Sequence, residues 1–214
     1  MKVILIIVYA LLVSSHIFCQ ENLDLRDDVL ITSTFTEREI EGLESMIQYV
    51  DNKVTQESID PSINKAYHLF FEKISKSKEY FDPFGETEKY QFLNSLDSVQ
   101  FSAVWKFETD IQVLNTGDTI YRNLKNIPQL VIKPFSKYMD YLKEVGKEDS
   151  YFEALQKNFT TIGSFSLDDF VWFFKNHSTF NFTIPKNRLW AVIYILRMEE
   201  TMDKKLERYL NIKN

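Results

Sequence analysis

The stretch TEREIEGLESMIQYVDNKV, residues 36 to 54, carries the clearest helix signal in the chain. Thr36 and Glu39 have the spacing of a capping box, in which each side chain satisfies a backbone N–H at the start of a helix. Apolar residues then recur every three or four positions, which places them on one helix face. They are Ile40, Leu43, Ile47, Val50 and Val54. This pattern predicts an amphipathic helix over about 37–55.

Similar signals continue along the chain. Caps, first-turn prolines and terminal glycines, together with apolar spacings of three and four, predict further helices. Their expected ranges are 61–80, 86–96, 134–146, 150–163, a helix from 166, and 187–210. Pro134 is expected to open its helix with Phe135 on the packed face, and Ser150 with Glu153 to form a capping box. Because short loops make neighbouring helices antiparallel, the sequence predicts an all-α fold: an irregular bundle of about seven helices, mostly antiparallel hairpins.

Residues 98–114 fit two patterns. Val99, Phe101, Ala103, Trp105 and Phe107 alternate with more polar residues as in a strand, but the same stretch also suits a helix capped by Asp97. The arrangement of Asp97 and Gln100 resembles a capping box, and few other strands are expected to pair with this one. Since a lone hairpin is marginal in water, we predict a helix here.

The N-terminus resembles a secretory signal peptide. Lys2 is followed by eleven uncharged residues, Val3 to Val13, which are too few for a membrane span of about 20 apolar residues. Cleavage after Ser15 or after Cys19 is workable, and we favour a signal peptide over 1–19. A lipid anchor on Cys19, the only cysteine, is the alternative; Phe18 and His16 stand where lipoprotein signals prefer other residues. The protein is expected to be exported, periplasmic or secreted, with no transmembrane segment in the mature chain.

The remaining chain, 20–214, is expected to form a single helical domain, because it contains no Gly-rich or Ser-rich linker. Its formal charge is 24 minus 31, or −7, and residues 20–60 hold eleven acids against three bases. We expect 20–33 to be a loosely ordered acidic lead-in. The acidic balance disfavours nucleic-acid partners, whose phosphates require a basic face, and anionic lipid surfaces.

Catalytic motifs are scarce in the sequence. The mature chain has two histidines, and His68 with Glu72 is interpreted as an ordinary pair on a helix surface. No zinc-ligand spacing, GxSxG elbow or phosphate-binding glycine loop is present, so we expect no metal and no cofactor. Paired carboxylates occur at Asp168-Asp169, at Glu199-Glu200, and at Asp110 beside Glu108. All lie where solvated helix ends or faces would place them.

Aromatic residues are unusually frequent, with eighteen Phe, eleven Tyr and three Trp. FVWFF, residues 170–174, places large rings around a whole helical turn, so the helix is either buried on several sides or partly exposed for binding. Trp172, Phe173, Tyr151 and Trp190 are the candidate binding residues. The glycosylation sequons at Asn158, Asn176 and Asn181 are no more numerous than composition predicts.

The sequence thus favours an exported, non-catalytic helical protein that binds a protein or an envelope glycan through helix surfaces. The alternative is a carboxylate-dependent hydrolase, for example one acting on glycans. That alternative requires two acids that converge in a cleft.

Overall fold

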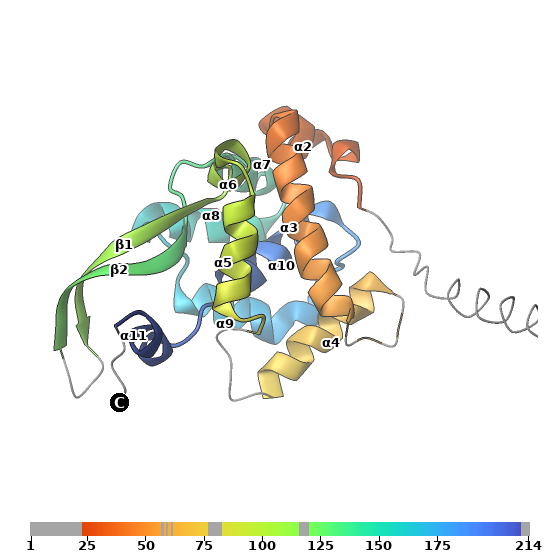
Figure 1. Ribbon diagram of the computed structural model, residues 1–214. Coiled ribbons are helices and arrows are strands. Elements are labelled where there is room, and N and C mark those ends of the chain that lie inside the picture. The colour runs from red at the N-terminus through yellow and green to blue at the C-terminus, as the bar shows by residue number, and fades with distance from the viewer. Residues whose placement is uncertain are drawn as a thin grey trace, which may run out of the picture.

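The computed structural model describes residues 23–56, 58, 60, 62–76, 83–115 and 120–210. This part of the chain is mostly helical with one two-stranded sheet (Figure 1). The first half contains η2 (Leu25–Asp27), α2 (Val29–Thr34), α3 (Glu37–Thr55), α4 (Ile63–Lys76), α5 (Glu86–Ser95), α6 (Ser98–Ser102), β1 (Trp105–Asn115) and β2 (Ile120–Ile132). The second half contains α7 (Lys137–Val145), α8 (Ser150–Ile162), α9 (Leu167–Asn176), η3 (His177–Thr179), α10 (Pro185–Arg197) and α11 (Met202–Leu210).

The helix predicted over 37–55 is confirmed. Thr36 and Glu39 form the capping box, and the apolar stripe faces inward. Further along α3, Asp51 is buried against α4 and α10. It accepts a hydrogen bond from the Tyr67 hydroxyl at 2.7 Å and forms an ion pair with Arg188. This buried polar contact ties three helices together.

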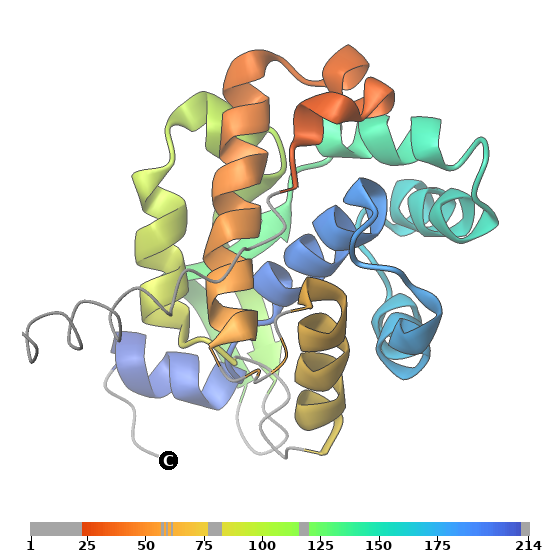
Figure 2. The same ribbon diagram turned by 90° about the vertical axis from the view of Figure 1, so that its right-hand side faces the viewer.

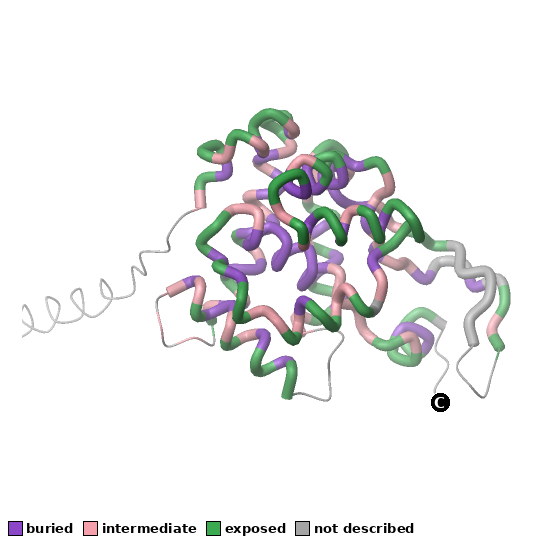
Figure 3. The backbone as a smooth tube through the Cα atoms, turned by 180° about the vertical axis from the view of Figure 1, so that it is seen from behind, coloured by how far each residue is buried: buried purple, intermediate pink, exposed green. Residues whose placement is uncertain are grey.

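The centre of the molecule is α10. Every residue from 187 to 196 is buried, and Figure 3 shows this segment as a continuous buried tube inside the other helices. A helix that is apolar on all sides is stable only when other elements surround it. Figure 2 shows α3, α4, α8 and α9 around it. The single helix predicted over 187–210 is too long. The chain turns after α10, and α11 lies against β2.

Polar contacts explain the break between α10 and α11. Glu199 lies in the break and accepts hydrogen bonds from the backbone N–H of Leu130, at 2.6 Å, and from the Tyr90 hydroxyl, at 2.6 Å. These contacts hold the chain in a non-helical conformation. Apolar periodicity runs across 187–210, but it contains no signal of these distant partners.

The helix predicted over 98–114 is wrong beyond its first turn. Asp97 and Gln100 do form a capping box, but α6 ends at Ser102 and the chain continues into β1, which pairs antiparallel with β2. This hairpin is not isolated: Trp105, Leu130 and Ile132 belong to the same buried core as the helices. The helical body therefore supplies the packing that a lone hairpin lacks.

The acidic lead-in is also ordered from residue 23 onward. Leu25 and Ile31 are fully buried, and Asp28 caps α2 by accepting hydrogen bonds from the N–H groups of Leu30 and Ile31. We expected a loosely ordered lead-in over 20–33, whereas 23–33 contains η2 and most of α2. Leu25 and Ile31 dock this acidic segment on the core, because each buries its whole side chain.

Helix starts in the second half are predicted with small errors. The helix from 166 is confirmed with its Ser166–Asp169 capping box. However, α7 begins at Lys137 after a turn in which Phe135 has a φ of 59° and is 97% exposed, so Phe135 does not pack. Asp149, not Ser150, caps α8.

The other two predicted helices are observed with ends shifted by one or two residues where the structure describes them. The 86–96 helix is observed as α5, and the second helix is observed as α4, although 77–80 lie outside the described residues. The leader, Cys19 and both cleavage positions lie outside them as well. Within the described part of the chain, no helix is both long enough and apolar enough to cross a membrane.

Candidate binding surface around Trp172

Two helices, α8 and α9, place an aromatic pair at the surface. Tyr151 is the second residue of α8, where its N–H donates to the capping carboxylate of Asp149 at 3.1 Å. Trp172 lies midway along α9. Their rings stack with centroids 4.8 Å apart and planes at 26°, and Phe180 meets both rings edge-on. The indole of Trp172 is thus supported on its inner side.

A hydrogen bond from the buried core holds the side chain of Tyr151 in place. The indole Nε1–H of Trp190 donates to the Tyr151 hydroxyl at 3.0 Å. Burial raises the pKa of Tyr151 well above its ordinary value, so this hydroxyl stays protonated at physiological pH. Stacking and hydrogen bonding together hold Tyr151, and through it Trp172, in one orientation.

The four candidate residues are brought together, but they divide into two kinds. Phe173 and Trp190 are fully buried, with centroids 5.7 Å apart, and contribute to the core. Trp172 is 46% exposed, and Tyr151 is partly buried beneath it. Only Trp172 and the edge of Tyr151 are therefore available to a ligand. Consecutive helix residues differ in direction by about 100°, which is why Trp172 and Phe173 face opposite environments.

Polar side chains border the aromatic pair. Lys186 forms an ion pair with Asp149 at 2.6 Å, and Asn158 donates to Asp169 at 2.8 Å. Both carboxylates act electrostatically on the Tyr151 hydroxyl and raise its pKa. The two carboxylates therefore act on Tyr151 from the starts of α8 and α9, and each is paired with a neighbouring side chain.

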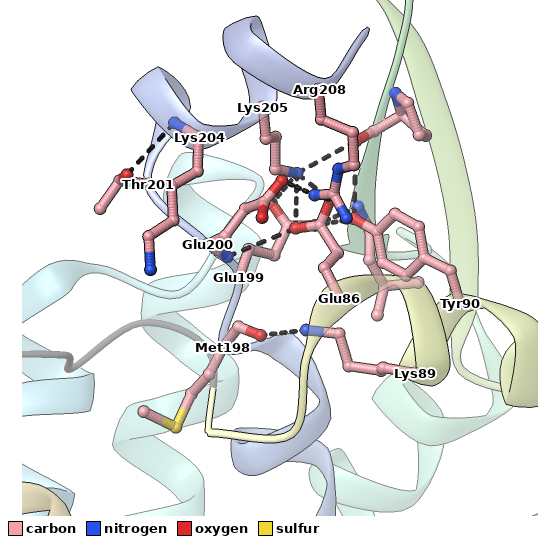
Figure 4. Close-up of polar contacts among 12 residues, drawn as sticks. Glu86, Lys89, Tyr90, Met198, Glu199, Glu200, Thr201, Lys204, Lys205 and Arg208 are labelled. Carbon is pink, nitrogen blue, oxygen red and sulfur yellow. Dashed lines mark hydrogen bonds and ion pairs between the residues drawn. The ribbon is translucent and has the colours of Figure 1, made fainter.

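The carboxylate pairs required by a hydrolase have other partners. Asp169 accepts hydrogen bonds from Ser166 in the capping box of α9, and Glu108 binds Lys106 at 2.5 Å; the side chain of Asp110 lies outside the described part. Glu199 and Glu200 belong to a cluster of three acids and three bases between α5, α11 and the break after α10 (Figure 4). Its charged members are Glu86, Lys89, Glu199, Glu200, Lys205 and Arg208.

This cluster is balanced in charge. Its centre, Glu86 and Lys205, is buried, whereas the side chain of Arg208 at its edge is 31% exposed. Lys205, 1% exposed, binds Glu199 at 2.9 Å and Glu86 at 3.1 Å, and Arg208 binds Glu86 and Glu200 (Figure 4). Burial raises the pKa of Glu86. A shifted acid is a feature of active sites, but here ion pairs occupy its oxygens. These ion pairs attach α11 to α5 and to the break after α10.

One contact that sequence reasoning missed joins the two histidines. The Nδ1 atoms of His68 on α4 and His177 at the start of η3 are 3.1 Å apart. The expected surface pair of His68 and Glu72 is not what forms: Glu72 binds Lys76 at 2.6 Å, and the His68 ring packs against Phe182. The histidines are 109 residues apart, so no local pattern could have paired them.

A small hollow of about 60 Å³ lies between α3 and α4. Its described lining is mostly apolar, and contains Val54, Ser58, Ala66, Leu69, Phe70 and Lys73. None of these lining residues is an acid or a histidine. The hollow therefore does not supply the converging carboxylates that a hydrolase requires.

Comparison with known proteins gives no relative. The chain matches no protein-family model, no curated protein and no solved structure. Functional inference therefore rests on the geometry of the described residues.

Proposed function

We propose that this protein is exported by its N-terminal signal and acts as a non-catalytic binding protein for a saccharide of the cell envelope. The binding site is the platform formed by Trp172 and Tyr151. The observation that carries this proposal is the half-exposed indole of Trp172, stacked on Tyr151. Loss of the signal peptide with Cys19 and a periplasmic or secreted location belong to the same proposal.

The size of the platform favours a small ligand. A large aromatic side chain offers about 150 to 250 Å², so the exposed 46% of Trp172 corresponds to roughly 100 Å². At about 25 cal/mol per Å² its burial contributes roughly 2.5 kcal/mol. A protein interface needs about 800 Å² from each partner, whereas one ring matches the apolar C–H face of one sugar residue.

The groups around the platform suit a polyol. A stacked sugar directs its hydroxyls sideways, toward donors and acceptors at the edge of the ring. Asp149 and Asp169, which act electrostatically on Tyr151, would supply acceptors, and their partners Lys186 and Asn158 would supply donors. Such a mixture of one apolar face with a few polar groups is typical of small-molecule sites. Because the support beneath Trp172 is already formed, binding costs little ordering of the protein.

Binding to isolated envelope polysaccharide tests this proposal. Trp105 and Trp190 are fully buried, so quenching of tryptophan fluorescence by iodide reports mainly on Trp172. We expect polysaccharide to protect this fluorescence in the wild type. Because Trp172→Ala lacks the reporting indole, the affinities of the variant and the wild type are compared by co-sedimentation with the polysaccharide. The variant should bind more weakly by about tenfold or more, because about 1.4 kcal/mol corresponds to a factor of ten. The matched control is Phe135→Ala, which removes an exposed aromatic ring on the turn before α7 and should leave binding unchanged.

The results separate the competing functions. Equal affinity of the Trp172→Ala variant and the wild type would refute the platform. If protease treatment of the envelope abolishes binding while Trp172 is still required, the partner is a protein on the same surface. Release of reducing sugar from the polysaccharide would instead support the hydrolase alternative, which the ion-paired state of Glu86 and Glu199 does not favour.

A further inference from the structure

A second site is indicated by the two histidines that meet between α4 and η3. The chain has three histidines, and His68 and His177 face each other through their Nδ1 atoms at 3.1 Å. Their rings are tilted by 37° with centroids 5.3 Å apart, so the contact is between nitrogens and not between ring faces. Both side chains are partly exposed.

The Nδ1 separation matches two ligands of one metal ion. With metal–nitrogen bonds of about 2.05 Å, two nitrogens 3.1 Å apart subtend an angle of about 98° at the metal. This value lies between about 90° for a square-planar site and about 109° for a tetrahedral one. Imidazole is the ligand that Zn²⁺, Cu²⁺ and Ni²⁺ share.

We propose that His68 and His177 bind a divalent transition-metal ion such as Zn²⁺ or Cu²⁺ through their two Nδ1 atoms. Water fills the remaining coordination positions of the metal. Among the described residues no group of three or more histidine, cysteine or acidic side chains is arranged to hold a metal. The site is therefore one with two protein ligands. This inference is independent of the proposed saccharide binding.

The surroundings favour a cation once both rings are neutral. Desolvation lowers the pKa of both histidines, and the charge of His177 lowers that of His68 further. Their lone pairs are thus available at neutral pH. The carboxylate of Glu72 acts electrostatically on His177 from one turn along α4 and would also attract a metal ion. In the metal-free pair one Nδ1 carries a hydrogen and donates it to the other. When the ion binds, that ring carries its hydrogen on Nε2 instead, so that both Nδ1 lone pairs face the metal.

Binding at this position would connect two parts of the chain. His68 belongs to α4, whereas His177 joins α9 to η3. An ion held by both would stabilise the folded state by mass action, since the unfolded chain does not preform the site.

The test uses the full chain with His16→Gln and Cys19→Ser in every sample, so that the leader offers no ligand. Cu²⁺ is titrated alone and followed by electron paramagnetic resonance, and thermal unfolding is measured with and without Zn²⁺. We expect one Cu²⁺ per chain with hyperfine coupling to two imidazole nitrogens, and a Tm that rises with Zn²⁺. His68→Gln and His177→Gln should each weaken metal binding by roughly tenfold or more. Each variant removes one of the two protein ligands, and even the loss of a residue that only supports a ligand typically costs about tenfold or more in metal affinity. Glu144→Gln, an exposed carboxylate on α7, is the matched control and should bind as the wild type does.

Nuclear magnetic resonance of the histidine ring nitrogens keeps the proposal testable if a variant unfolds. Zn²⁺ should shift the Nδ1 signals of both His68 and His177. Absence of saturable binding, unchanged affinity in either variant, or a shift confined to Nε2 atoms would overturn the proposal.

Discussion

The buried pair of Asp51 and Arg188 offers the sharpest test of how this fold is held together. Asp51 is 3% exposed and Arg188 is 2% exposed. The guanidinium contacts both carboxylate oxygens, and the Tyr67 hydroxyl donates to one of them. Replacing Asp51 with alanine removes the acceptor of both partners at the junction of α3, α4 and α10.

The expected cost follows from leaving buried polar groups without this carboxylate. Breaking a buried ion pair from one side costs about 3–5 kcal/mol, and a buried hydroxyl that loses its acceptor costs about 1–3 kcal/mol. Because contacts in one network are not additive, we expect Asp51→Ala to lower the free energy of unfolding by about 4 kcal/mol. Replacing the whole network by apolar residues, as in Asp51→Leu with Arg188→Met and Tyr67→Phe, should recover at least half of this loss.

Equilibrium urea unfolding, followed by far-ultraviolet circular dichroism and by tryptophan fluorescence, measures both effects. With a slope of about 2 kcal/mol per molar urea, the midpoint should fall by about 2 M in Asp51→Ala. Lys76→Ala, which breaks the exposed pair with Glu72, is the control and should leave the midpoint unchanged. A shift in Asp51→Ala no larger than that of the control would refute the reasoning, as would a triple variant no more stable than Asp51→Ala.

Three further outcomes are expected. Because the folded-state pKa values of His68 and His177 are lowered, the unfolded chain binds more protons than the folded chain below pH about 6.5. Tm should therefore fall as the pH falls from 7.5 to 5, and it should fall less steeply in His177→Gln. Equal slopes of Tm against pH in the variant and the wild type would count against a role of the two histidines. Gly42→Ala should destabilise the protein by about 1–3 kcal/mol in urea unfolding, despite the better helix propensity of alanine, because the new Cβ would lie 2.7 Å from the Cβ of Gln100 and 2.9 Å from its Cα. Phe135→Gly should leave stability unchanged or raise it by up to about 1 kcal/mol, since an exposed side chain is lost and a φ of 59° suits glycine; a lower Tm would contradict this.

Local signals predicted the helix starts because a capping box needs only residues i and i+3. The boxes at Thr36 and Asp97 are observed, whereas the one predicted at Ser150 is replaced by a cap from Asp149. The larger errors arose where a distant partner decided the outcome. Glu199 ends α10 by binding the backbone of Leu130, and the hairpin is stabilised by a helical core that no window of sequence contains.

The candidate site likewise combines features that the local sequence predicts with features that distant contacts decide. Aromatic composition alone singled out Tyr151, Trp172, Phe173 and Trp190, and the structure places all four in contact within one cluster. Helical periodicity fixes the directions of Trp172 and Phe173 relative to each other, but it does not say which one faces the core. That was decided by the packing of α9 against α10, which buries Phe173 and leaves Trp172 half exposed.

The sequence by itself determined where most helices begin and that large aromatic rings would fill the interior. Only the tertiary structure decided that 105–115 and 120–132 pair as antiparallel strands, that α10 is the buried centre, and that His68 meets His177. The physical reason is the range of the interactions. Caps and helix faces act over a few residues, whereas strand pairing, burial on all sides and the meeting of two imidazoles require segments that the chain brings together only when it folds.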